Sequence, residues 1–119
     1  MNHIELGQEG ERLAALHLQS KKHFIRAQNY RYQRGEIDII SETDDFIIVT
    51  EVKTRQSRNY GSPANAVTRK KQRQLIQVMN AYLCGDENKK EVRFDLVLII
   101  LNQHELEIKH VENAFYPVL

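Results

Sequence analysis

The sequence predicts an α/β fold, in which helices cover a mixed central β-sheet, for this chain of 119 residues. Two segments carry apolar residues at helical spacing, and five others carry the apolar runs or the alternation typical of strands. The fourth strand comes directly after the second helix, so a crossover connection can place it in the same sheet as the first three. The expected order is therefore αβββαββ, and the length suits one compact domain over residues 1–119.

The first half of the chain should form a helix and three strands. The helix is expected over residues 8–22, where leucine and alanine recur at helical spacing. Strands should follow over residues 23–31, 36–41 and 46–54. The second and third strands are apolar on both faces, which is typical of central strands covered on two sides.

The second half should form a helix and two strands. Ser62 and Pro63 have the pattern of an N-cap followed by proline at the first helical position, so the helix is expected from there to Leu83. A strand is expected over residues 93–101, and a shorter, more polar one over residues 105–111 at an edge of the sheet. The helix should bury one apolar stripe, formed by Val67, Leu75, Ile76, Met79 and Leu83.

The second and third strands should form a tight hairpin. If Asp44 and Asp45 make a two-residue turn, residues whose numbers sum to 89 face each other across the strands. Asp38 then lies opposite Glu51, and Glu36 lies opposite Lys53. All four side chains share one face, because side chains along a strand alternate with period two.

An aspartate opposite a glutamate needs a counter-charge, because like charges directly opposed across strands are destabilising. A divalent cation such as Mg²⁺ or Mn²⁺ would supply it, with Asp38, Glu51 and the backbone carbonyl of Val52 as ligands. Lys53 would point into the same site and stabilise charge on a phosphate. The alternative is a surface ladder in which Glu36 pairs with Lys53 beside a tolerated Asp–Glu contact, and spacing alone leaves both readings open.

Charges are segregated along the chain despite a net charge of only +1. Residues 36–51 contain six acids and no Lys or Arg, whereas residues 52–85 contain seven bases and no acid. Acids gather where a cation would bind, and bases gather where a polyanion could lie beside it. A solvated face is the alternative. The candidate nucleic-acid-binding residues are Arg55, Arg58, Arg69, Lys70, Lys71 and Arg73, with Lys71 nearer the Leu75 face and so closer to the site.

The composition of the chain indicates the cellular compartment in which the protein works. No apolar run approaches the roughly 20 residues that span a bilayer, and residues 1–5 have neither the basic start nor the apolar core of a signal peptide. Cys84 is the only cysteine, which excludes an internal disulfide and suits a reducing compartment. A cytoplasmic protein with no membrane partner is expected.

The motifs resemble those of a known nuclease group. Asp38 followed by Glu51-Val52-Lys53 resembles the core of the PD-(D/E)XK nuclease superfamily. The longer pattern resembles the bacterial YraN-like family of predicted endonucleases, which is related to archaeal Holliday junction resolvases. The matching segments are Gly7-x-x-Gly10-Glu11-x-x-Ala14, Asn29, Gly35-Glu36-Ile37-Asp38, Glu51-Val52-Lys53-Thr54-Arg55, Gly61, Lys70 or Lys71, Arg93-Phe94-Asp95 and Asn113-Ala114-Phe115.

The resemblance implies a restriction-endonuclease-like αβββαβ core with Asp38 and Glu51 as metal ligands and Lys53 as the catalytic lysine. Related nucleases often add an acid from the first helix, and Glu11 matches that position. The alternative for Glu11 is a carboxylate that complements the helix dipole. Glu36 completes the candidate catalytic set. Ile37 replaces the proline in the superfamily's name.

The expected function is a metal-dependent endonuclease that acts on DNA, with branched or flapped DNA as candidate substrates. Because no base-reading motif is present, recognition through phosphates is expected. The alternative is a non-catalytic nucleic-acid-binding module of the same fold that acts in DNA repair, recombination or uptake. RNA stays open as a substrate, and cutting two strands would favour a homodimer.

Three further groups of residues have weaker signals. The five histidines, which are His3, His17, His23, His104 and His110, show no metal-ligand spacing and are expected at the surface or at an edge. Asp95 lies within an apolar strand and is expected to be structural. Tyr30, Tyr32 and Tyr60 lie among arginines, an arrangement that suits stacking on bases.

Overall fold

The computed structural model describes residues 1–59 and 66–116. Its element order is the predicted αβββαββ, with α and β elements that match a restriction-endonuclease-like αβββαβ core followed by one more strand. The elements are α1 (His3–Ser20), β1 (Phe24–Tyr32), β2 (Gly35–Glu42), β3 (Phe46–Arg55), α2 (Arg69–Leu83), β4 (Glu91–Leu101) and β5 (Leu106–Val111).

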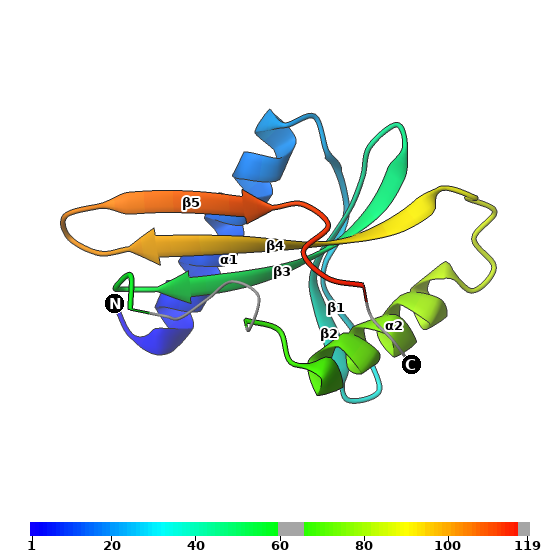
Figure 1. Ribbon diagram of the computed structural model, residues 1–119, viewed down its shortest axis with the longest axis horizontal. Coiled ribbons are helices and arrows are strands. Elements are labelled where there is room, and N and C mark those ends of the chain that lie inside the picture. The colour runs from blue at the N-terminus through cyan, green and yellow to red at the C-terminus, as the bar shows by residue number, and fades with distance from the viewer. Residues whose placement is uncertain (60–65, 117–119) are drawn as a thin grey trace.

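The strands form one mixed sheet in the order β1-β2-β3-β4-β5. All neighbours are antiparallel except β3 and β4, which are parallel and joined through α2. Figure 1 shows α1 behind β3, β4 and β5, and α2 beside the β1–β2 hairpin. The late strand β4 therefore enters the sheet by the predicted crossover, and β5 lies at an edge as expected.

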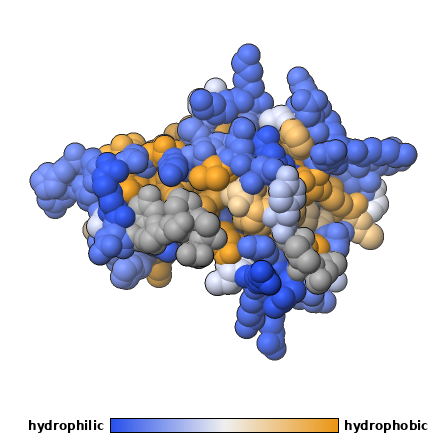
Figure 2. Space-filling view, in the orientation of Figure 1, coloured by the Kyte–Doolittle hydropathy of each residue, from blue (hydrophilic) through white to orange (hydrophobic). Residues whose placement is uncertain are grey.

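Each helix covers its own part of the hydrophobic core. Ile40 and Val49 pack with Leu75 and Val78 under α2, whereas Leu18 of α1 packs with a second cluster that contains Ile39, Val97 and Ile99. The strands β2 and β3 are thus buried on both faces, as their apolar runs predict. In Figure 2, hydrophobic residues occupy the middle of the face shown and hydrophilic side chains project around its rim.

The hairpin has the predicted register. Four pairs from Ile39–Thr50 to Glu42–Ile47 all have residue numbers that sum to 89. The amide of Thr43 donates to the carbonyl of Phe46 at 2.9 Å and closes the two-residue turn. Ladder pairing ends at Ile39–Thr50. The predicted pairs Asp38–Glu51 and Glu36–Lys53 therefore lie just beyond it, where the two strands separate.

The predicted start of α1 is wrong by five residues. The helix begins at His3, because the side chain of Asn2 accepts a hydrogen bond from the amide of Glu5 at 2.8 Å and caps it. Neither α1 nor α2 is both long enough and apolar enough to cross a membrane, and this statement covers only the described residues.

The predicted start of α2 is also wrong. The helix begins at Arg69, with Thr68 as the N-cap that accepts from the amide of Lys71 at 3.1 Å. The predicted cap at Ser62 and Pro63 lies outside the described residues. Val78, rather than the predicted Ile76, belongs to the buried stripe with Leu75 and Met79, and Val67 is buried ahead of the helix.

Candidate active site

Four elements meet around a polar hollow of about 350 Å³ at the point where β2 and β3 separate. Its lining includes most of the candidate catalytic side chains. They are Glu11 from α1, Asp38 from β2, and Glu51 and Lys53 from β3. Lys71 from α2, one of the candidate nucleic-acid-binding residues, lines the hollow too.

The end of the hairpin ladder creates this hollow. Beyond the Ile39–Thr50 pair, the amide of Val52 donates to the Asp38 carboxylate at 2.8 Å. Asp38 is therefore held against β3 by its side chain. The carbonyl of Val52 leaves the strand on the same edge as its amide, so it lies on the side where Asp38 sits.

A close helix contact brings Glu11 to the site. Gly10 is buried where α1 crosses β3, and a Cβ atom at Gly10 would lie 1.8 Å from the Oγ1 of Thr54. Only glycine allows this approach. The helix can therefore lie directly on β3 and place the next residue, Glu11, at the hollow.

Burial raises the pKa of Asp38 to about 6. The negative charges of Glu11 and Glu36 act in the same direction, while the amide of Val52 and the charge of Lys71 oppose the shift. Desolvation disfavours the ionised carboxylate, and nearby charges modify that penalty according to their sign. Asp38 thus lacks enough positive charge around it to hold a carboxylate at its ordinary pKa.

Glu51 is shielded from solvent more strongly, with 3% of its surface exposed. Burial raises its pKa to about 7, and the charge of Asp38 adds to this shift. Lys71 and Lys53 oppose the shift without cancelling it. The Oε1 atom of Glu51 is buried and has no hydrogen-bond partner. A buried carboxylate oxygen without a partner is costly, and a bound cation would satisfy it.

The donors around the hollow fit a hard divalent cation. Asp38, Glu51 and the Val52 carbonyl are all oxygen donors, and Mg²⁺ is typically held by one or two carboxylates with the rest of its shell left to water and phosphate. Within residues 1–59 and 66–116, no group of three or more His, Cys, Asp or Glu side chains is placed to hold a metal ion, so a cation here would rely on fewer than three such ligands. The donor set therefore suits an open Mg²⁺ or Mn²⁺ site rather than a structural zinc site.

A second layer of polar residues links the acids of α1 and β2. The side chain of Asn29 donates to Glu11 and to Glu36, each at 3.1 Å. Glu36 also lies 3.5 Å from Arg31. No Glu36–Lys53 ion pair occurs among the described residues, so the surface-ladder alternative is not supported.

Asn29 is the residue that sequence reasoning missed as part of the site. It lies inside β1 with a φ of 52°, a left-handed conformation that asparagine tolerates better than most residues. The available signal was an asparagine within a strand, where this residue type is depleted.

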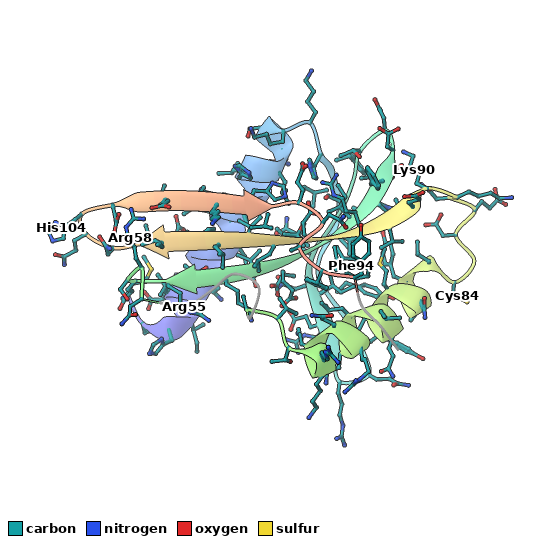
Figure 3. All side chains as sticks on the ribbon, in the orientation of Figure 1. Arg55, Arg58, Cys84, Lys90, Phe94 and His104 are labelled. Atoms are coloured by element: carbon teal, nitrogen blue, oxygen red, sulfur yellow. The ribbon has the colours of Figure 1, made fainter. Side chains whose placement is uncertain are left out.

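The candidate nucleic-acid-binding residues divide into three sets. Arg55 and Lys71 line the hollow. Arg69, Lys70 and Arg73 are exposed on α2. The third set is Arg58 alone, which pairs with Glu105 at 2.7 Å and also with Glu107; Figure 3 places it at the end of the sheet where His104 lies.

The first turn of α2 has an unfavourable charge arrangement for a free helix. Arg69, Lys70 and Lys71 occupy it, and no acid does. A helix N-terminus carries a partial positive charge and favours anions. Three cations there repel both the helix dipole and one another. A bound polyanion would remove this repulsion.

The prediction that the histidines lie at the surface or an edge is wrong for His23, whereas His110 lies on the edge strand β5. His23 is buried, and its Nδ1 lies 2.9 Å from the Ser41 hydroxyl. His17 and His110 are partly buried, with Nε2 and Nδ1 3.3 Å apart. His110 is far from His17 and His23 in the chain, so no local spacing could indicate that they meet.

Asp95 is fully buried beside these histidines and has a structural environment, as expected. Arg93 donates to both of its oxygens at 2.8 and 2.9 Å, and His110 lies 2.8 Å away. Burial alone would raise the pKa of Asp95, but the hydrogen bonds from His110, Arg93 and the amide of Asn113 lower it.

Tyr60, one of the three tyrosines considered for stacking, lies outside the described residues.

Comparison with known proteins shows a family that extends over nearly the whole chain. A family model described as "Uncharacterised protein family UPF0102" matches residues 10–99, a span that contains the lining acids and lysines. A UPF0102 protein of Christiangramia forsetii is 41% identical over 96% of this chain and 96% of its own length. Similar proteins from Phocaeicola vulgatus (41% identical, 97% and 95%) and Alkaliphilus oremlandii (40% identical, 93% and 97%) carry the same family name. These names state no activity.

Proposed function

Since the chain belongs to the uncharacterised protein family UPF0102, whose name assigns no activity, we propose its function from the site: it is a metal-dependent endonuclease that hydrolyses phosphodiester bonds in DNA. The observation that carries this proposal is the buried pair of Asp38 and Glu51, one oxygen of which has no partner, in a hollow that also holds Lys53 and Lys71. Their spacing in the chain is that of the PD-(D/E)XK nucleases, and the proposal includes membership of that superfamily.

Asp38 and Glu51, with the Val52 carbonyl, would hold the cation. When bound, Mg²⁺ or Mn²⁺ supplies positive charge beside the phosphate and acidifies water. The amide of Val52 fixes the orientation of Asp38 through its 2.8 Å hydrogen bond. Glu51 is kept out of bulk water, so its charge acts through a medium of low dielectric constant.

Two lysines would act on the phosphate. Lys53 follows Glu51 by two residues and shares the hollow, so its ammonium group can stabilise the negative charge that develops during hydrolysis. Lys71 reaches the hollow from α2, with its Nζ 3.5 Å from the carbonyl of Glu36. Its position suits holding the phosphate in place. Glu11 and Glu36, joined by Asn29, would orient water or a second cation at the rim.

Structure-selective cutting of branched or flapped DNA fits this site better than sequence-specific cutting. The cationic side chains that line the hollow can contact phosphates, and phosphate contacts position a strand without carrying sequence information. Cutting two strands of a junction would favour a homodimer.

The second candidate is a nucleic-acid-binding module of the same fold that does not cut and acts in repair, recombination or uptake. The basic first turn of α2 would serve this function equally well. The buried carboxylate pair favours the enzyme, because binding alone gives no reason to keep two destabilising acids. RNA remains a further substrate to test.

The deciding experiment is a titration of Mg²⁺ and Mn²⁺ against cleavage of single-stranded, duplex and four-way-junction DNA, with an RNA arm. We expect metal-dependent cleavage that falls by about 10²- to 10³-fold in Lys53→Ala, the loss typical of removing one charge-stabilising group. Lys109→Ala, at an exposed lysine on β5, is the matched control and should cut at the original rate. If the unmodified protein does not cut DNA, and both variants still bind it, the result would favour the non-catalytic binding module.

A further inference from the structure

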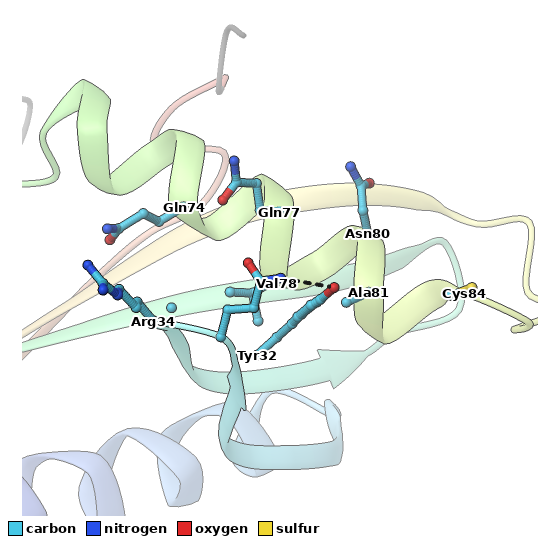
Figure 4. A pocket seen from close by; sticks show the side chains of 10 residues that line it. Tyr32, Arg34, Gln74, Gln77, Val78, Asn80, Ala81 and Cys84 are labelled. Atoms are coloured by element: carbon cyan, nitrogen blue, oxygen red, sulfur yellow. Dashed lines mark hydrogen bonds between the residues drawn. The ribbon is translucent and has the colours of Figure 1, made fainter.

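A second, larger hollow of about 780 Å³ lies between α2 and the turn that joins β1 to β2. Figure 4 shows Tyr32 and Arg34 facing α2 from the hairpin, and Gln74, Gln77 and Asn80 projecting from the helix. We call this hollow the amide groove. Nothing in the proposed catalytic chemistry uses it.

The chemistry of the amide groove suits a flat, neutral, hydrogen-bonding ligand. It offers one aromatic ring from Tyr32 and carboxamides from α2, and the side chain of Gln33 donates to the Tyr32 hydroxyl at 3.5 Å. Carboxamides carry both donors and acceptors, as the edges of nucleobases do. Among the described residues that line the groove none is acidic, and Arg34 adds a positive charge.

Gly35 keeps the hairpin and the helix close together. A Cβ atom at Gly35 would lie 2.4 Å from the Cγ2 of Val78, so no side chain fits at this position. The floor of the groove is therefore formed by backbone and by the buried Val78, while its walls are polar. A planar ring could lie against this floor with its edge toward the amides.

The amide groove and the candidate active site are both lined by residues of β2 and α2. Gly35, in the groove, is followed directly by Glu36, whose carbonyl lies near the ammonium group of Lys71. Asp38, in the active site, lies three residues after Gly35 along β2. Three residues of strand span about 10 Å, and this is roughly three nucleotide steps of a B-form strand. One bound strand could therefore reach both places.

An exposed stripe of side chains on α2 runs between the candidate active site and the amide groove, and it changes from basic to neutral along its length. Lys70, Arg73, Gln77 and Asn80 follow one another at intervals of three or four residues and so lie on one side of the helix. All four are exposed. The half of the stripe at the start of α2 is basic, whereas the half beside the amide groove is neutral and hydrogen-bonding.

We propose that the amide groove binds an unpaired nucleobase of a DNA strand whose phosphates run along the basic half of α2 to the carboxylate–lysine site. The inference rests on the proposed function and extends it, because it assigns the substrate a single-stranded segment a few nucleotides from the bond that is cut. Tyr32 stacks on the base, and Gln77 and Asn80 bond its edge. A base in a duplex cannot make these contacts, because its faces are stacked on neighbouring bases and its Watson–Crick edge is paired.

The test compares two single-stranded DNA oligonucleotides that differ only in three central nucleotides, which are intact in one and abasic in the other. Binding is measured by fluorescence anisotropy in a Lys53→Ala background, so that the strand is not cut. The intact strand should bind about tenfold more tightly than the abasic strand, as expected for one base stacked on an aromatic ring. Tyr32→Ala should remove this difference, and Tyr32→Phe should keep it.

Blunt duplex DNA is the control ligand, and its affinity should be the same in all three proteins. Tyr32 is exposed, at 38%, so its variants should fold. If Tyr32→Ala does not fold, Gln77→Ala, at an exposed position, should reduce the preference for the intact strand severalfold. Equal binding of intact and abasic strands by the parent protein would overturn the base site while leaving the nuclease proposal standing. Failure to bind any of the three DNAs would overturn both.

Discussion

Asp38 and Glu51 make the metal-free fold less stable as the pH rises. Their pKa values of about 6 and about 7 lie above the value near 4 of a carboxyl group in an unfolded chain. Between pH 4 and pH 7 the folded state therefore holds protons that the unfolded state has released. Stability falls with pH wherever the folded state binds more protons, so this pair contributes a loss of stability across that window. A bound cation would offset the loss.

The first prediction joins metal binding to this pH dependence. Millimolar Mg²⁺ or Mn²⁺ should raise the melting temperature by a few degrees at pH 8, where a ligand at ten times its Kd contributes about 1.4 kcal/mol. The shift should shrink toward pH 5, because protons compete with the cation for Asp38 and Glu51. Thermal melts with and without metal at each pH measure it.

Asp38→Asn should remove the metal shift and flatten the fall in metal-free stability between pH 4 and pH 7. Asp44→Asn, at an exposed residue of the hairpin turn, is the matched control and should leave both unchanged. Equal metal shifts in the two variants would mean that the cation binds elsewhere on the protein.

At the residue scale, the sequence predicts what depends on one hairpin and misses what depends on contacts between distant elements. A two-residue turn sets the register, so the positions of Asp38 and Glu51 follow from counting along two strands. The bond from Asn29 to Glu11, and the meeting of His17 with His110, require the path of α1 across the sheet. No local spacing contains that path.

At the element scale, the two glycines of α1 differ in what surrounds them. A Cβ atom at Gly7 would have no heavy atom within 4 Å, whereas one at Gly10 would lie within 3 Å of three Thr54 side-chain atoms. Intrinsic helix propensity favours alanine over glycine by about 1 kcal/mol at either position. Only the packing against β3 distinguishes them.

The second prediction uses these glycines as a matched pair. Gly7→Ala should raise the free energy of unfolding by about 0.5–1 kcal/mol, as an alanine does in an unobstructed helix. Gly10→Ala should instead lower it by roughly 1–3 kcal/mol, because overpacking forces α1 away from Thr54. Urea denaturation of both variants measures the two changes. Stabilisation by Gly10→Ala would show that α1 does not lie directly on β3.

Element types and strand bounds could be predicted closely, whereas the helix starts could not. Strands follow apolar runs that local reading detects, and β3 begins at Phe46 as expected. Ser62 and Thr68 are both competent N-caps, and the choice between them depends on where Leu75 and Val78 must lie to cover the sheet. Tertiary packing therefore decides the start of α2.

At the scale of the whole molecule, the fold converts charge segregation along the sequence into neighbouring surfaces. The hairpin carries the acids into the hollow, and the crossover brings the basic start of α2 beside it, where Lys71 reaches the same hollow. The sequence predicts this arrangement as a whole, because bases follow acids directly in the chain. Arg58 departs from it, since its ion pairs with Glu105 and Glu107 hold it at the β4–β5 turn.

The last prediction separates DNA binding from cleavage. Lys70 and Arg73 are exposed on α2, so reversing both charges to glutamate should weaken DNA binding if phosphates lie along this helix. Each phosphate contact releases condensed counterions, and losing one flattens the slope of log affinity against log salt by about 0.9 for duplex DNA. Anisotropy titrations between roughly 50 and 200 mM salt give the slope. Lys53→Ala should lose cleavage and keep most of the binding.

A second double reversal, Lys89→Glu with Lys109→Glu, makes the same change in net charge at exposed lysines away from α2. If DNA lies along α2, this control should retain the original salt slope, because it removes long-range attraction but no phosphate contact. Equal loss of affinity in both double variants would mean that only the net charge matters. An unchanged affinity and slope in the Lys70 and Arg73 variant would mean that DNA does not follow α2. The cations at the start of that helix would then be balanced by solvent alone, despite the repulsion they create with the helix dipole.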